Sequence, residues 1–240
     1  MSSKSILITG ATSGLGYSLF EDYVAQGHQV IACGRNQQQL EVMQSKALQV
    51  CQFDMTDKRQ IEHAAEKVGA LDILILNAGN CRYIDDAKNF DGALFADVIQ
   101  TNLISLGWLL QYFLPKVKKG GQVVFVSSSA TLLPFTRSEA YGASKAGMDY
   151  LANSLRLDLV KAEIDVTLIH PGFIKTPLTD KNDFPMPFLL SSEEASQRML
   201  KAIEQRKRYA HFPKRLTLLL KFISFLPSFV WQKLILKGSH

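Results

Sequence analysis

The sequence predicts an α/β fold in which helices cover both faces of a doubly wound parallel sheet of about seven strands. Short apolar runs alternate with helical patterns of about ten or more residues, which is typical of parallel strands joined by crossover helices. The first apolar run, Ser5-Ile6-Leu7-Ile8, leads directly into a glycine-rich turn and then into a helical pattern. Together these observations indicate a Rossmann-type sheet.

We expect strands at residues 4–9, 28–33, 48–53, 72–76, 121–127, 164–170 and 208–212. Ligands of such sheets bind beyond the carboxyl ends of the strands, near the point where the strand order reverses. Residues suited to ligand binding stand at or just after six of these strand ends: Gly10, Gly34, Asp54, Asn77, Ser128 and Pro171. The sequence therefore predicts one binding crevice at this edge of the sheet.

The composition indicates one domain with a large core. The chain has 240 residues, of which 47% are hydrophobic, and no linker, repeat or low-complexity tract divides it. We expect a dinucleotide-binding and catalytic domain at 1–212, a helical extension packed on it at 213–237, and a purification-tag remnant at 238–240. The segment before the first strand is too short for a signal peptide, so a cytoplasmic protein is expected.

The cysteines predict neither a metal site nor a disulfide framework. Cys33, Cys51 and Cys81 are an odd number at wide spacings, and they form no Cys-x-x-Cys pair. We expect free structural thiols and no metal.

The glycine-rich turn reads Thr9-Gly10-Ala11-Thr12-Ser13-Gly14-Leu15-Gly16, with the spacing Gly-x-x-x-Gly-x-Gly. Glycines allow backbone amides and a helix N-terminus to approach a phosphate closely. Most glycine clusters mark ordinary turns, but a position between a strand and a helix favours nucleotide binding.

Tyr141, Lys145 and Ser128 predict a proton-transfer site. Residues four apart on a helix share one face, so the ammonium of Lys145 can lie over the phenol of Tyr141 and favour its ionised form. A phenol has an unperturbed pKa of ~10, and a nearby cation makes it usable as an acid or base near neutrality. Ser128, at the end of an expected strand, can donate a hydrogen bond to a substrate oxygen. Taken alone, a Tyr-x-x-x-Lys pair is more often part of a helix surface.

The motifs resemble those of the short-chain dehydrogenase/reductase family in its single-domain form. From residue 4 to about 212 they follow the family's order: Thr9 to Gly16, Asp54, Asn77-Ala78-Gly79, Asn102, Ser128, Tyr141 with Lys145, and Pro171-Gly172 followed by Thr176. Leu76 stands where the family often has an Asn. Within Ser127-Ser128-Ser129, spacing favours Ser128.

The resemblance implies a role for each matching residue. Asp54 would meet the edge of the adenine ring, and Asn77 to Gly79 would support the central portion of the cofactor. After Pro171 and Gly172, the backbone of Ile174 and the side chain of Thr176 would fix the nicotinamide carboxamide.

Two polar residues have competing interpretations. The resemblance implies that Asn102, within a helix, holds a water that links Lys145 to solvent, whereas a local hydrogen bond is the ordinary alternative. His170 ends an apolar strand and is expected to be a packed histidine and not an acid or base.

Gly34 and Arg35 bear on the choice of cofactor. NAD-selective sites place an acid after the second strand to bind the ribose hydroxyls, whereas a 2′-phosphate calls for a cation. Here a glycine stands where the acid would be, and an arginine follows. With the resemblance, this implies a preference for NADP(H) and weaker binding of NAD(H). A solvated arginine at a helix start is the alternative.

The expected activity is NADPH-dependent reduction of a ketone or aldehyde to an alcohol, with Tyr141 as the acid and Ser128 steadying the oxygen. The segment from Pro177 to Leu190 lies where the family builds its substrate lid. Its apolar side chains suggest a hydrophobic substrate, although core packing explains them equally well. A non-catalytic NADPH-binding sensor or scaffold is the alternative. We expect no nucleic-acid partner, and a homodimer or homotetramer.

The C-terminal segment concentrates positive charge and apolar residues. From Gln205 to His240 there are eight Lys or Arg residues and no acid. Residues 213–237 predict two amphipathic helices separated near Pro227, with Lys214, Thr217, Lys221 and Ser224 as a polar stripe and Leu216, Leu219, Leu220 and Ile223 as the apolar face. We expect this face to cover the substrate entrance, to contact a second subunit, or to touch a membrane surface.

Overall fold

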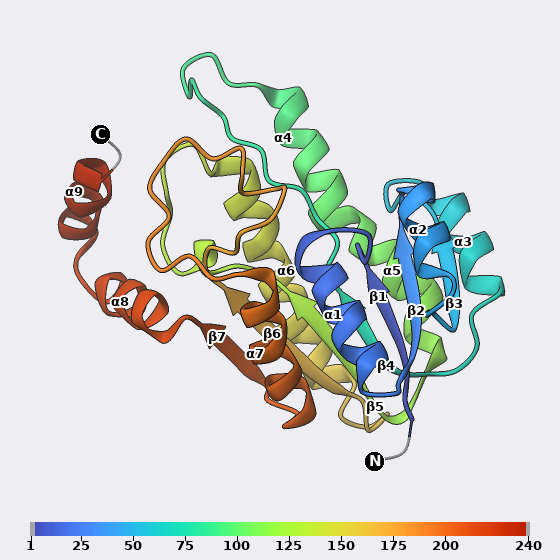
Figure 1. Ribbon diagram of the computed structural model, residues 1–240. Coiled ribbons are helices and arrows are strands. Elements are labelled where there is room, and N and C mark those ends of the chain that lie inside the picture. The colour runs from blue at the N-terminus through green and yellow to red at the C-terminus, as the bar shows by residue number, and fades with distance from the viewer. Residues whose placement is uncertain (1–2, 239–240) are drawn as a thin grey trace.

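The computed structural model describes residues 3–238, so the expected tag remnant lies largely outside the described residues. It contains a seven-stranded parallel sheet in the order β3-β2-β1-β4-β5-β6-β7 (Figure 1). The strands are β1 (Ser5–Thr9), β2 (Gln29–Gly34), β3 (Gln49–Gln52), β4 (Leu71–Leu76), β5 (Val117–Val126), β6 (Asp165–Pro171) and β7 (Tyr209–Phe212). The chain builds outward from β1 to β3 and then crosses to β4 on the other side of β1. This reversal places a crevice beyond the carboxyl ends of β1 and β4.

Helices cover both faces of this sheet (Figure 1). One face carries α1 (Gly14–Ala25), α2 (Gln37–Met43) and α7 (Ser192–Glu204). The other carries α3 (Lys58–Glu66), α5 (Ser105–Phe113) and α6 (Glu139–Asp158), with α4 (Gly92–Ile99) packed against α6. The predicted Rossmann-type fold is therefore confirmed.

The alternating side chains of β1 explain why the core has two parts. Ile6 and Ile8 pack in the cluster with α1 and α7, whereas Leu7 packs in the cluster with α3, α5 and α6. All three are fully buried. A strand that is covered on both faces is apolar at every position, which is why the sequence shows a continuous apolar run here.

Strand β5 begins at Val117, although the sequence predicted a start at 121. Val117 pairs with Leu71 of β4, and the register then shifts before Gln122 pairs with Ile73. Lys118 and Lys119 are exposed between these two pairings. The sequence prediction was wrong at this end because the exposed, polar residues near the start of the strand lack the apolar pattern by which strands are recognised.

The helical run Gly92–Lys116 is long and apolar enough to cross a membrane by length and composition. It contains α4, a π-helical turn at Gln100–Ile104, and α5. Leu106, Leu109 and Phe113 on it are buried in the core. Packing against the sheet explains the apolar character of this run.

Two helices follow β7 at the left of Figure 1: α8 (Lys214–Ser224) and α9 (Ser228–Gly238), as the sequence predicted. Leu216 and Leu220 are buried, but Leu219, which we expected on the buried face, is half exposed. Thr217, from the expected polar stripe, is fully buried instead. Its hydroxyl donates to the carbonyl of Pro213 at 3.0 Å and lies 2.7 Å from Nδ1 of His211, so burial leaves it hydrogen-bonded.

Candidate active site

The glycine-rich turn between β1 and α1 has no room for side chains at its tightest point. A Cβ on Gly16 would lie 2.1 Å from the carbonyl oxygen of Gly10, and Gly10 itself has φ +67°. Ser13 caps α1 without a side-chain hydrogen bond. The amides of the first turn of α1 are thus not satisfied by their cap, and a helix N-terminus in this state suits a phosphate.

Gly34 and Arg35 end β2 beside this turn. A Cβ on Gly34 would lie 2.6 Å from Cγ2 of Thr12, so the Thr12 side chain fills the space that any larger residue would need. The side chain of Arg35 is 76% exposed, and its Nη1 lies 3.3 Å from Oδ2 of Asp54. The guanidinium is therefore available at the rim of the crevice.

Asp54 is held by its neighbours. Its Oδ1 accepts hydrogen bonds from the amide and the hydroxyl of Thr56, at 2.8 and 2.7 Å. Burial favours a higher pKa for Asp54, but the hydrogen bonds from Thr56 and Arg35 outweigh burial and lower it. The carboxylate is consequently charged at neutral pH.

Asn77 joins the ends of β4 and β1. Its Nδ2 donates to the carbonyl of Thr9 at 3.0 Å, and the amides of Asn77 and Ala78 donate to the Thr9 hydroxyl at 3.0 and 3.1 Å. Gly79 follows, where a Cβ would lie 3.0 Å from Oδ1 of Asn102. These contacts fix the middle of the crevice floor.

Asn102 is fully buried in the π-helical turn, and its partners are distant in sequence. Its Nδ2 donates to the carbonyl of Asn80 at 2.8 Å and lies 3.1 Å from the hydroxyl of Ser144, while its Oδ1 accepts from the amide of Asn80 at 2.8 Å. The alternative of a merely local hydrogen bond is therefore wrong. Asn102 ties the crevice floor to α6.

The structure brings Ser128, Tyr141 and Lys145 together. Ser128 follows β5, and its side chain hydrogen-bonds with Tyr141 near the start of α6. The Lys145 ammonium lies 5.9 Å from the centre of the Tyr141 ring and donates to the carbonyl of Val126 at 3.0 Å. Ser129 is buried, and the Ser127 hydroxyl donates to the Lys145 carbonyl at 3.4 Å. Among the three serines, Ser128 is the one that contacts the phenol.

The expectation that Lys145 lowers the pKa of Tyr141 is wrong for this structure. Burial raises the pKa of Tyr141, and the hydrogen bond with Ser128 opposes this only in part. Burial also lowers the pKa of Lys145, to about 8, because desolvation disfavours its charged form. The phenol thus remains protonated near neutral pH, as a proton donor must.

A cleft of about 880 Å³ connects these residues. Its wall includes the glycine turn, Arg35, Asp54, Asn77 to Gly79, Ser128, Tyr141, Lys145, Pro171, Gly172, Ile174 and Thr176. The cofactor and catalytic positions predicted from the sequence all line it, except Asn102, which supports it from behind. One open cleft thus holds a phosphate-binding turn at one end and a proton donor at the other.

Comparison with known proteins gives the same result. Residues 4–185 match the family model for short chain dehydrogenase. The chain is 34% identical over 241 residues to an uncharacterized oxidoreductase of Myxococcus xanthus, covering 95% of this chain and 94% of that protein. The chain belongs to the short-chain dehydrogenase/reductase family. It is accordingly an oxidoreductase.

Two further family members show how varied the likenesses are. The NADP-dependent 3-hydroxy acid dehydrogenase YdfG of Escherichia coli K12 is 30% identical over 178 residues, covering 70% of this chain and 72% of that protein. A short chain dehydrogenase/reductase from Burkholderia phymatum, solved in complex with NAD, superposes with a TM-score of 0.81 at 20% identity over 92% of each chain. The second likeness shows the shared fold alone.

Cys81 is a free thiol near Tyr141 and Lys145, but it does not line the cleft. It is half-buried in the loop after the Asn-Ala-Gly motif of the family, and its side chain hydrogen-bonds with Tyr83. Burial raises the pKa of Cys81, while Tyr83 and Lys145 act to lower it. Cys81 stands two residues after Gly79, and this position in the sequence could have indicated that it lies near the site.

Arg137 ties the segment expected to form a lid, Pro177 to Leu190, to the loop after β4. Its guanidinium bonds Asp85, in the loop after β4, at 2.7 Å and Asp183, in the lid segment, at 2.7 Å. The ring of Phe184 packs on Tyr83 with centroids 5.5 Å apart. Within the lid, Leu178, Phe188 and Leu189 remain partly exposed, whereas Leu190 is buried in the core. Pro177 and Leu178 line the cleft, so the segment combines a cleft-lining part with a packed part.

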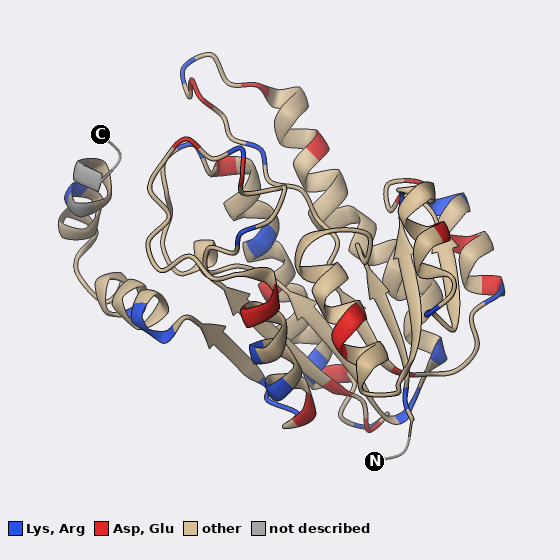
Figure 2. Cartoon of the chain, viewed as in Figure 1, with Lys and Arg blue, Asp and Glu red and all other residues tan. Residues whose placement is uncertain are grey.

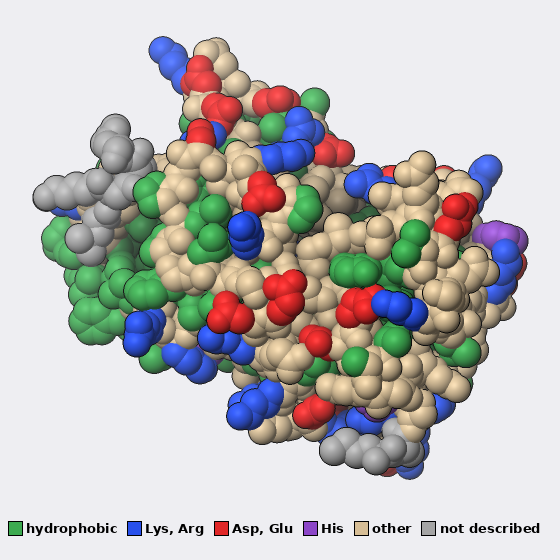
Figure 3. Space-filling view, viewed as in Figure 1, with side chains coloured by type: hydrophobic (Ala, Val, Ile, Leu, Met, Phe, Trp, Pro, Cys, Tyr) green, Lys and Arg blue, Asp and Glu red, His purple; other side chains and the backbone are tan. Residues whose placement is uncertain are grey.

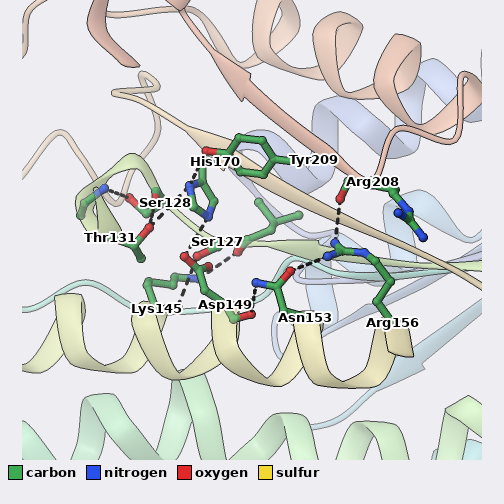
Figure 4. Close-up of polar contacts among 12 residues, drawn as sticks. Ser127, Ser128, Thr131, Lys145, Asp149, Asn153, Arg156, His170, Arg208 and Tyr209 are labelled. Atoms are coloured by element: carbon green, nitrogen blue, oxygen red, sulfur yellow. Dashed lines mark hydrogen bonds and ion pairs between the residues drawn. The ribbon is translucent and has the colours of Figure 1, made fainter. Parts of the chain in front are cut away.

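His170 is buried, as expected, but it belongs to a polar network (Figure 4). Its Nε2 lies 2.9 Å from Oδ2 of Asp149, and its Nδ1 lies 3.0 Å from the Tyr209 hydroxyl and 3.5 Å from the Thr131 hydroxyl. Asp149 stands on α6 one turn after Lys145. The network therefore connects α6, which carries Tyr141 and Lys145, to β6 and β7.

Proposed function

We propose that the protein is an NADPH-dependent reductase that converts a hydrophobic ketone or aldehyde into an alcohol. The observation that carries the proposal is the contact of Tyr141 with Ser128, with Lys145 beside them, at the floor of the cleft. A protein that only bound a nucleotide would need the glycine turn but not a protonated phenol paired with a serine and a lysine.

The proposed roles follow from where each group lies. The bound nicotinamide nucleotide supplies the hydride. Tyr141, whose pKa is raised by burial, gives its proton to the substrate oxygen, and Ser128 donates a hydrogen bond to the same oxygen as charge develops on it. Lys145, whose ammonium lies 5.9 Å from the centre of the Tyr141 ring, would hold the ribose hydroxyls, and Asn102 braces the floor.

The glycine turn and Arg35 support a preference for NADP(H) over NAD(H). The turn excludes side chains as a phosphate cradle does, and the exposed guanidinium of Arg35 can pair with a 2′-phosphate. Thr12 fills the space beside Gly34, so an acid that would bind the ribose hydroxyls of NAD has no room there. YdfG is NADP-dependent by name, which agrees with this proposal.

The apolar side chains at the lid support a hydrophobic substrate. Leu178 lines the cleft, and Phe173, which stands between the cleft-lining Gly172 and Ile174, packs on Phe184 with ring centroids 6.2 Å apart. A substrate that reaches Tyr141 past these residues must bury apolar surface.

Exposed apolar residues also support the expected homo-oligomer. Tyr150 and Leu157 lie seven residues apart on α6, which places them on one helix face, and Ile104 is exposed just before α5. Large exposed apolar side chains of this kind suit a surface that a homodimer buries. Light scattering of the purified protein measures the assembly.

The deciding experiment is a screen of NADPH consumption against chemically varied ketones and aldehydes, with Tyr141→Phe as the blank. Turnover of at least one apolar carbonyl compound by the wild type, and none by the variant, is expected. Tight NADPH binding without turnover of any compound would favour the alternative, a sensor or scaffold that uses the nucleotide only as a ligand.

A further inference from the structure

The C-terminal helices expose large apolar side chains in one region of the surface. Phe222 is 66% exposed, Phe225 88% and Phe229 64%, and Leu218, Leu219 and Leu236 are at least half exposed. Figure 3 shows this region as a continuous group of hydrophobic side chains at the left of the molecule. An exposed apolar patch on this scale marks a surface that is covered in the working protein.

Poor packing of α8 does not explain why these apolar side chains are exposed. The opposite side of α8 is buried against the domain through Leu216, Thr217 and Leu220, and a Cβ on Gly172 would lie 2.8 Å from Leu216. Trp231 of α9 packs against the same cluster. Both helices are thus anchored by one side while the phenylalanines point away from the protein.

Positive charge borders the patch. Lys214 and Arg215 occupy the first turn of α8, Lys221 lies over the Tyr209 ring at 4.4 Å, and Lys233 is exposed on α9. Among the residues that the structure describes, Lys214, Arg215 and Lys221 form no ion pair with an acid. Figure 2 shows basic residues on α8 and α9 and no acidic ones.

The basic groups also act on one another. The pKa of His211 is lowered to about 4, mainly by desolvation and to a smaller extent by the positive charges of Lys214 and Lys221. Burial and the neighbouring Lys221 lower the pKa of Lys214 as well. A ligand that brings anionic groups to this border would relieve the repulsion.

We propose that α8 and α9 dock the protein on an anionic lipid surface, with Phe222, Phe225 and Phe229 entering the acyl boundary and the basic residues meeting the headgroups. Aromatic side chains on one face and cations at its border are the features of helices that lie in the membrane interface. A second copy of the chain fits less well. Two such faces would bring their cations together, and residues 205–240 contain no acid to pair with them.

The test uses the full-length protein and co-sedimentation with vesicles of phosphatidylcholine alone or of phosphatidylcholine with phosphatidylserine. The variant replaces Phe222, Phe225 and Phe229 with Ser. The matched control is Val42→Ser with Leu48→Ser, which removes exposed apolar side chains far from this region. Thermal unfolding shows that each variant is folded.

We expect the wild type and the control to sediment with the anionic vesicles, less with phosphatidylcholine alone, and less as salt is raised. The triple variant should bind at least about tenfold more weakly, because the removed aromatic area supplies most of the attachment. Absence of wild-type binding to anionic vesicles at low salt would overturn the proposal. A triple variant that keeps full vesicle binding but loses a dimer in light scattering would also overturn it, in favour of a second copy. Reductase activity has no bearing on either outcome, so failure of the proposed function would be seen separately.

Discussion

Oδ2 of Asp149 lies 2.9 Å from Nε2 of His170, one helical turn beyond Lys145 (Figure 4). His170 immediately precedes the Pro171-Gly172 turn that borders the cleft, and it also contacts Tyr209 on β7. The Asp149 carboxylate raises the pKa of Lys145, against the larger effect of burial. The Asp149 carboxylate thus favours the charged form of Lys145.

Asp149→Asn should shift the pH profile of turnover. The charged fraction of Lys145 falls as pH rises through its pKa of about 8. Removal of a carboxylate that raises this pKa moves the loss of charge, and with it the alkaline fall in activity, to lower pH. The comparison is the pH dependence of kcat/KM in the wild type, in Asp149→Asn, and in Asp158→Asn, which alters an exposed acid of the same helix. An unchanged alkaline limb in Asp149→Asn would show that the carboxylate does not tune Lys145.

Tyr141→Phe should lower kcat by about 10²–10⁴-fold while NADPH affinity stays close to that of the wild type. The ring and its packing survive, and only the transferable proton is lost. Stopped-flow turnover and fluorescence titration of NADPH separate the two effects. Tyr150→Phe, on the exposed side of the same helix, is the control and should behave as the wild type. Comparable turnover by Tyr141→Phe would require another acid.

Ser128→Ala should reduce kcat by about tenfold or more, whereas Ser129→Ala should leave it nearly unchanged. Of these two serines, Ser128 is the one that hydrogen-bonds with the Tyr141 side chain, and Ser129 is buried in the short helical turn that follows. Steady-state kinetics with one ketone measure both variants. A larger loss in Ser129→Ala would mean that the serine register is shifted by one residue.

Arg35→Gln should weaken NADPH binding by roughly ten- to hundredfold, with little effect on NADH, because a charge-assisted contact contributes ~1.5–3 kcal/mol. Only NADPH carries the phosphate that the exposed guanidinium would pair with. Titration of both cofactors measures the effect, and Arg198→Gln on the exposed side of α7 controls for loss of charge. Equal weakening of the two cofactors would place Arg35 outside the phosphate site.

Arg137→Met should loosen the lid and raise KM for bulky ketones by up to about fivefold, with a smaller change in kcat. Its ion pairs with Asp85 and Asp183 are exposed to solvent, which screens them, so the expected effect is modest. Arg82→Met removes an exposed ion pair with Asp97 and serves as the control. The ratio of KM values for a bulky and a small ketone is the measurement. An unchanged ratio would show that the lid position does not depend on Arg137.

The sequence by itself determined the sheet and the order of its motifs along the chain. These features are local. Strands buried on both faces appear as apolar runs, a turn that excludes side chains requires glycine, and residues four apart on a helix share a face. Gly16, Tyr141 and Lys145 could therefore be placed before any coordinates were known.

Only the tertiary structure decided which distant groups meet. The partners of Asn102 lie 22 and 42 residues away, and His170 meets Asp149 and Tyr209 from two other elements. The pKa of Tyr141 rises because burial outweighs the hydrogen bond with Ser128, a balance that depends on solvent access and not on spacing. Helical periodicity predicts which residues share a face of a helix, but it does not predict which face packs on the protein. This is why the burial of Thr217 and the exposure of Phe225 became clear only in the structure.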